Sequence, residues 1–140
     1  MKFIVIVKAT EETEAGAPPD EKLMNDMMKY NDELVKAGVM LAGEGLHPSS
    51  KGARIRFNGD KRTVIDGPFS ETKELVAGFW IWEVKSLAEA IEWAKRCPNP
   101  TGDESVLEIR QVYGPGELTD NEEFNEKEAR MRDEIASKQS

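Results

Sequence analysis

One short run of the chain combines charged side chains with turn-forming residues. It extends from Asp66 to Glu74 and reads DGPFSETKE. An apolar segment that predicts a strand precedes Asp66, and the Gly-Pro pair after it predicts a turn, so the carboxylate would lie at a strand end and face a crevice. There Asp66 could act as a general base or orient a histidine. Alternatively, it could accept hydrogen bonds from the amides of the turn that follows.

His47 is the single histidine of the chain. It follows a predicted strand over residues 39–46, so it could lie near Asp66 across the sheet. A His–Asp pair would provide a base that titrates near neutral pH. We therefore take Asp66 and His47 as the candidate catalytic residues, with the alternative that no imidazole chemistry takes place.

Candidate binding residues lie on both sides of the Asp66 turn. Arg54 and Arg56 are two apart on a predicted strand and so share a face, where two guanidinium groups could hold the carboxylate or phosphate of an anionic ligand. Alternatively, they lie on a solvated face and pair with neighbouring acids. Glu74 could gate a pocket, form an ion pair with a neighbouring charge, or be solvated. Tyr30 is expected in the core on the first long helix, with its hydroxyl at the rim of a pocket.

Composition excludes several classes of function. The net charge of −8 argues against nucleic acid and anionic membranes as partners. No apolar run approaches the roughly 20 residues of a membrane span. A single cysteine, Cys97, cannot form an intramolecular disulfide, which favours the cytoplasm. One histidine and one cysteine without ligand spacing, and no glycine-rich phosphate loop, predict neither a metal site nor a cofactor.

The order of predicted elements indicates an α+β domain. It is strand, helix, strand, hairpin, strand, helix, strand, which is typical of a ferredoxin-like βαββαβ fold with an extra hairpin. We expect this domain over residues 1–115 and an acidic helical arm over 116–140. The strands are expected at 3–8, 39–46, 53–58, 62–65, 76–84 and 106–112, and the helices at 20–36, 86–97 and 119–136.

Several strands are apolar on both faces. In the first, Phe3, Val5 and Val7 alternate with Ile4 and Ile6. Two helices can cover only one face of a sheet, so the second face needs another cover. The most economical cover is a second copy of the sheet, which predicts a homodimer with the two sheets face to face.

The stretch VIDGPFSETKE, from Val64 to Glu74, resembles the signature of the DGPF group within the YCII-related family. The motifs Gly43-Glu44-Gly45-Leu46, Gly78-Phe79 and Arg96-Cys97-Pro98 also match, and the resemblance covers about residues 1–113. It implies a ferredoxin-like dimeric α/β barrel. A His–Asp pair proposed in relatives suggests an enzyme, and some members look like companions of extracytoplasmic-function sigma factors. No established activity comes with the family.

Two functional hypotheses follow. The first is a homodimer that binds a small molecule between the sheet and the first long helix, near Asp66, with or without acid–base catalysis. The second is a non-catalytic regulatory or interaction module that uses its dimer surface and its acidic arm. The first predicts a concave site in which Asp66 lies beside another titratable group. The second predicts an Asp66 bonded to backbone amides and no large cavity.

Overall fold

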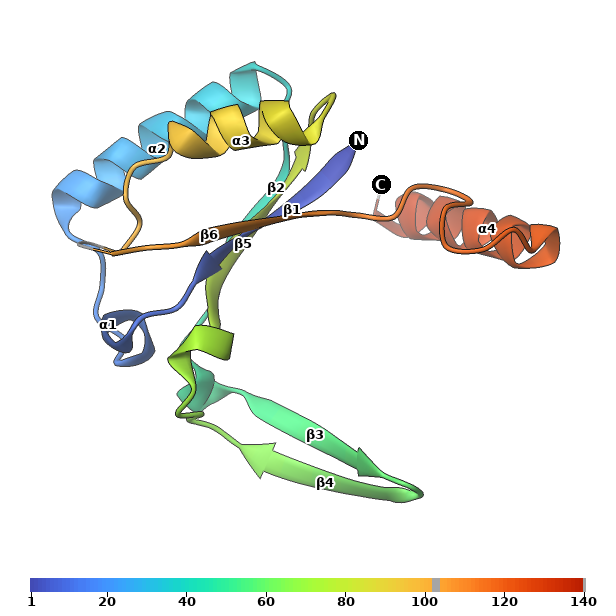
Figure 1. Cartoon of the computed structure of the whole chain (residues 1–140), viewed down its shortest axis with the longest axis horizontal. Coiled ribbons are helices and arrows are strands. Elements are labelled where there is room, and N and C mark those ends of the chain that lie inside the picture. Colours follow the sequence, from blue (N-terminus) through green and yellow to red (C-terminus); the bar gives the residue numbers. More distant parts are fainter. Residues whose placement is uncertain (102–103, 140) are drawn as a thin grey trace.

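The computed structural model describes residues 1–101 and 104–139. Strands, helices and two short 3-10 turns follow one another along the chain (Figure 1). Their bounds are β1 (Lys2–Lys8), α1 (Glu11–Glu14), α2 (Glu21–Lys36), β2 (Met40–Gly45), η1 (Ser49–Lys51), β3 (Ala53–Asn58), β4 (Lys61–Asp66), η2 (Thr72–Glu74), β5 (Val76–Glu83), α3 (Leu87–Lys95), β6 (Leu107–Gln111) and α4 (Glu122–Gln139).

The main sheet has four strands in the order β2-β5-β1-β6, and all neighbours are antiparallel. Phe3 of β1 pairs with Trp82 of β5, and Val5 pairs with Trp80. The two central strands therefore direct matching apolar side chains to the same face. This arrangement of strands and helices is α+β and consistent with the ferredoxin-like fold that the order of predicted elements indicated.

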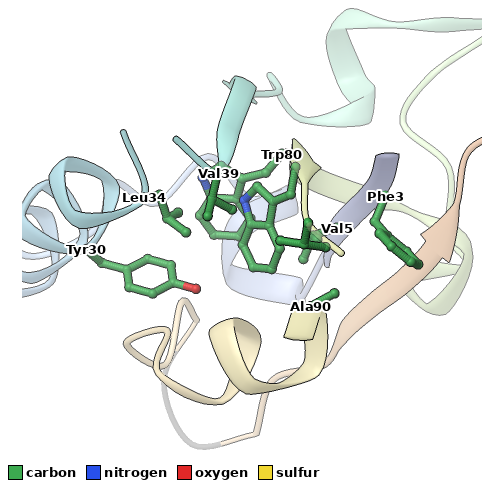
Figure 2. Packing of buried hydrophobic residues seen from close by; sticks show 9 residues of the cluster. Phe3, Val5, Tyr30, Leu34, Val39, Trp80 and Ala90 are labelled. Atoms are coloured by element: carbon green, nitrogen blue, oxygen red, sulfur yellow. The ribbon is translucent and has the colours of Figure 1, made fainter. Parts of the chain in front are cut away.

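The core lies between the main sheet and the pair α2 and α3 (Figure 2). Phe3, Val5, Trp80 and Trp82 contribute the sheet side of it, and all are buried. Side chains of α2 and α3 complete it from the other side. On α2 they follow the 3.6-residue spacing of its apolar positions, as predicted. On α3 the expected apolar face is wrong, because Leu87 and Ile91 are exposed and Ala90 is buried instead. The helical contribution comes from Tyr30, Leu34 and Ala90.

The opposite face of the main sheet carries no helix. Ile4, Ile6, Phe79 and Ile81 lie there, as the alternation along β1 and β5 predicted, and each is half-buried. The β3–β4 hairpin and α4 both stand away from the sheet on this side (Figure 1). We call this surface the open sheet face.

The predicted hairpin is confirmed, but it forms a separate two-stranded sheet from β3 and β4.

Two helix predictions need correction. The loop expected after the first strand contains α1, because Thr10 and Thr13 form a capping box that starts a helical turn. The last helix begins at Glu122 rather than at 119, because the Asn121 side chain accepts a hydrogen bond from the amide of Phe124 and so caps it.

No helix within residues 1–101 and 104–139 is both long and apolar enough to cross a membrane.

Candidate functional site

A cavity of about 1190 Å³ opens between α2 and one end of the main sheet. Its walls come from α1, the loop that joins α1 to α2, the first half of α2, and the segment after α3. Its volume is somewhat above the range of about 300–1,000 Å³ that is typical of small-molecule sites. The lining residues on which the argument below depends are Glu12, Ala17, Asn31, Gly43, His47 and Trp80.

The floor of the cavity is an indole ring held in place by an amide. Trp80 lines the cavity, and its Nε1 donates to the Oδ1 of Asn31 at 3.0 Å. The amide NH₂ of Asn31 has no acceptor among the described residues, so it can donate to a bound molecule. A Cβ at Gly43 would lie 2.8 Å from the Trp80 ring, so the missing side chain in β2 leaves room for the indole.

The ionisable side chains along the cavity are mainly acidic: Glu12, Asp20 and Asp26 against Lys22 and His47. Glu44 pairs with Phe79, so its side chain lies on the open sheet face instead. Two of the acids have partners of their own. Asp20 accepts a hydrogen bond from the Leu23 amide at 2.7 Å and caps α2, and Asp26 lies 3.6 Å from the ammonium group of Lys22. The remaining charge is negative, which favours neutral or positively charged molecules.

Among the site residues predicted from the sequence, His47 lines this cavity. It is exposed and follows β2, where the chain leaves the sheet. A base at the cavity wall with solvent access can exchange protons with a bound molecule. His47 thus lies at a cavity between the first long helix and the sheet, and its catalytic role stays a prediction.

Asp66 does not line the cavity. It ends β4, is exposed, and its carboxylate makes no hydrogen bond or ion pair within the described part of the chain. The alternative that Asp66 accepts from the amides of the turn is therefore wrong. The turn amides have other acceptors, since Gly67 donates to the Gly52 carbonyl at 3.0 Å and Phe69 donates to the Ser49 Oγ at 3.0 Å.

Close packing accounts for the glycine of the Asp-Gly-Pro run. A Cβ at Gly67 would lie 1.7 Å from the carbonyl oxygen of Ser49. The peptide between Gly67 and Pro68 is cis. The turn thus lies directly on η1, and the residue that follows the aspartate cannot carry a side chain.

Ser49 joins three segments of the chain. Its amide donates to Glu14 of α1 at 3.1 Å, its hydroxyl donates to the same carboxylate, and its Oγ accepts from the Phe69 amide. We call Glu14, Ser49 and Phe69 the serine junction. Because α1 and the segment around His47 both line the cavity, the junction connects the cavity wall to the turn at Asp66.

The two arginines of β3 lie outside the cavity. Arg54 stacks its guanidinium on the Phe69 ring at 3.9 Å from the centroid and lies 3.8 Å from the Glu74 carboxylate. Arg56 is exposed on the hairpin. The structure thus joins Arg54 with Glu74, as the ion-pair alternative expected, and separates both from His47.

Tyr30 belongs to the core rather than to the rim of the cavity. Its hydroxyl donates to the carbonyl of Trp93 at 2.6 Å, and burial raises the pKa of this phenol well above its ordinary value. Burial also raises the pKa of the nearby Cys97 thiol to about 11. Both groups therefore stay protonated at neutral pH, which leaves neither as a nucleophile or base.

Sequence reasoning missed Asn31, Glu14 and Ser49. Asn31 is a polar residue on the buried side of α2, one position after Tyr30, and that position was its signal. Glu14 and Ser49 are separated by 35 residues, and no sequence spacing indicates their contact.

Comparison with known proteins gives three findings. A family model described as the YCII-related domain matches residues 1–130. An uncharacterised protein of Rhizobium meliloti (strain 1021) is 35% identical over 101 residues, which cover 71% of this chain and 82% of that protein. The structure of 5-chloro-2-hydroxyhydroquinone dehydrochlorinase from Burkholderia phenoliruptrix AC1100, in complex with 2,5-dihydroxybenzoquinone, has a TM-score of 0.41 and 17% identity, and the match covers 81% of this chain and 96% of that one. A TM-score at this level carries no argument about fold or reaction.

Proposed function

The chain belongs to the YCII-related family, and we propose that this member binds a small molecule in the cavity between α2 and the main sheet. The observation that carries the proposal is the cavity of about 1190 Å³ with Trp80 and Asn31 in its floor. An aromatic surface beside a free amide donor is the combination by which proteins hold small ligands with an apolar part and a polar group.

The charge of the lining supports a neutral or positively charged ligand. Glu12 forms no ion pair within the described residues, whereas Lys22 already lies beside Asp26. The sequence suggested an anionic ligand because of Arg54 and Arg56. Those side chains lie outside the cavity, so they give an anion no support there.

If the site is catalytic, we propose His47 as its acid–base group. It is the histidine among the lining residues, and histidine is the side chain that most often serves in general acid–base catalysis. Asp66 lies on the other side of the serine junction and would act only through the position of this wall.

We also propose that two copies pack through their open sheet faces, which gives the dimeric α/β barrel expected for this family. The support is the row of half-buried apolar side chains on that face, Ile4, Ile6, Phe79 and Ile81. The charged residues Glu44, Glu108 and Arg110 flank this row on the outer strands, as a polar rim flanks an interface core.

A filled cavity tests the binding proposal. Ala17 is exposed and lines the cavity, whereas Ala15, two residues earlier, is exposed and does not. We expect Ala17→Trp to abolish the binding of benzylamine and benzyl alcohol, measured by ligand-observed NMR. We expect Ala15→Trp to leave binding unchanged.

Three outcomes would contradict this proposal. Benzoate could bind the native protein more tightly than benzylamine does, which would overturn the charge argument. Binding that persists in Ala17→Trp would place the ligand elsewhere. If none of the three probes binds at millimolar concentration, the interaction-module hypothesis becomes the better one.

A further inference from the structure

The β3–β4 hairpin exposes one apolar face. Ile55, Phe57 and Val64 lie on the same side of the two strands, because Ile55 pairs with Val64 and Phe57 pairs with Arg62. These three side chains are between 49% and 68% exposed. A free two-stranded hairpin is marginally stable in water, so an apolar face of this kind needs a cover.

Helix α4 also exposes an apolar face that nothing in its own chain covers among the described residues. None of its described residues is buried, and it stands away from the main sheet (Figure 1). Phe124, Met131 and Ile135 are exposed and fall on one stripe, since they are seven and four residues apart. The ion pair between Lys127 and Glu123 and others like it stabilise such a helix by only a few tenths of a kcal/mol each.

The charges of the two elements are complementary. Residues 53–66 hold four basic and two acidic side chains, whereas residues 117–139 hold eight acidic and four basic ones. Among the described residues of one chain, no ion pair joins the hairpin to α4. The hairpin's ion pair joins Arg54 to Glu74, and the ion pairs of α4 lie within α4.

The length of the hairpin also fits the length of α4. A strand of six residues spans about 20 Å and a helix of 18 residues about 27 Å, so the hairpin can lie along most of α4. Both elements stand on the side of the open sheet face (Figure 1). A second copy facing this side would bring its own hairpin and its own α4 into the same space.

We propose that the β3–β4 hairpin of one copy packs along α4 of a second copy of this chain. The apolar faces of the two elements meet, and the basic residues of the hairpin lie beside the acids of α4. Two-fold symmetry repeats this contact, so each dimer contains two of them. These two contacts hold the copies together in addition to the packing of the two main sheets. The contact needs the dimer but does not depend on the ligand or on His47.

Photo-crosslinking identifies the partner of the hairpin. A chain with Phe57→p-benzoylphenylalanine is mixed with a ¹⁵N-labelled native chain until the subunits exchange, and then irradiated. The control carries p-benzoylphenylalanine in place of Arg56, which is exposed on the opposite side of the hairpin. We expect position 57 to give a labelled adduct within residues 117–139 and position 56 to give much less.

Variants of α4 provide the second measurement. Met131→Glu with Ile135→Glu places two acids on the apolar stripe. Ala129→Glu with Ala136→Glu adds the same charge on the opposite side of the helix, as its control. We expect the first pair to raise the dissociation constant of the dimer about tenfold or more, and the control pair to change it far less.

The proposal is overturned if the adducts of position 57 map to its own chain or to the open sheet face. It is also overturned if the two double substitutions in α4 weaken the dimer equally, or if the native protein is a monomer. Circular dichroism of each variant shows that the fold is retained, so that a lost adduct or a weaker dimer reports on the interface.

Discussion

At the scale of single residues, the Asp-Gly-Pro run has a role that its sequence does not suggest. The residue that the structure constrains most is Gly67, whose backbone lies on the carbonyl of Ser49. Asp66, the residue that could act as an acid or a base, is exposed, and its carboxylate forms no hydrogen bond or ion pair within the described chain. The run is thus a packing device beside the cavity wall, and the ligand binding that we propose depends instead on His47, Asn31 and Trp80.

This assignment predicts that a side chain at position 67 strongly destabilises the fold. A Cβ there would meet the Ser49 carbonyl at 1.7 Å, so the turn must move away from η1. We expect Gly67→Ala to lower the free energy of unfolding by about 3 kcal/mol, measured by urea denaturation. Gly45→Ala is the matched control, because a Cβ there meets nothing within 4 Å. Equal stability of Gly67→Ala and the native protein would refute the packing role.

At the scale of elements, the serine junction connects parts that are distant in sequence. Glu14 of α1 holds Ser49, and Ser49 holds the amide of Phe69 in the turn after β4. The short helix α1 therefore owes its position to a carboxylate–serine contact as well as to its capping box. The cavity wall and the base of the hairpin are coupled through one side chain.

Removal of the Ser49 hydroxyl should loosen both segments at once. Ser49→Ala deletes one donor to Glu14 and the acceptor of the Phe69 amide. Because hydrogen bonds to charged groups are worth about 1.5–3 kcal/mol, we expect a loss of stability of about 2 kcal/mol. The Phe69 amide should also exchange its hydrogen faster, as followed by NMR.

Ser50→Ala serves as the control, because Ser50 is exposed and makes no hydrogen bond among the described residues. If the Phe69 amide exchanges at the native rate in Ser49→Ala, the junction does not hold the turn.

At the scale of the whole molecule, the apolar surface is unevenly distributed. One face of the main sheet is covered by α2 and α3, while the open sheet face carries Ile4, Ile6, Phe79 and Ile81 without a helix. The hairpin and α4 stand on the same side of the sheet (Figure 1), and both expose further apolar side chains. A second copy would cover the open sheet face, the hairpin and α4 at once. We therefore propose both the dimer and the contact between the hairpin of one copy and α4 of the other.

The dimer predicts a solution mass. Light scattering at micromolar concentration should give twice the 15.7 kDa of one chain. Ile81→Glu should give the mass of a single chain, because it places a charge in the centre of the open sheet face. Asn25→Glu, on the exposed side of α2, should remain dimeric. A native protein with the mass of one chain would rule out the dimer.

The sequence by itself determined the elements and the faces of the sheet. Strand alternation in Phe3–Lys8 and Val76–Glu83, the helical spacing around Tyr30 and Leu34, and the hairpin turn all rest on neighbours within a few residues. Such local patterns are strong enough to predict an α+β domain, its core and its uncovered face.

Only the tertiary structure decided which side chains share a site. It brought Glu14 to Ser49, Trp80 to Asn31 and Gly67 to Ser49, and it separated Asp66 from the cavity that contains His47. The reason is physical: these contacts join residues up to 49 positions apart along the chain. No local pattern of residue types carries that information, because the same Asp-Gly-Pro run serves equally well in a turn and beside an active site.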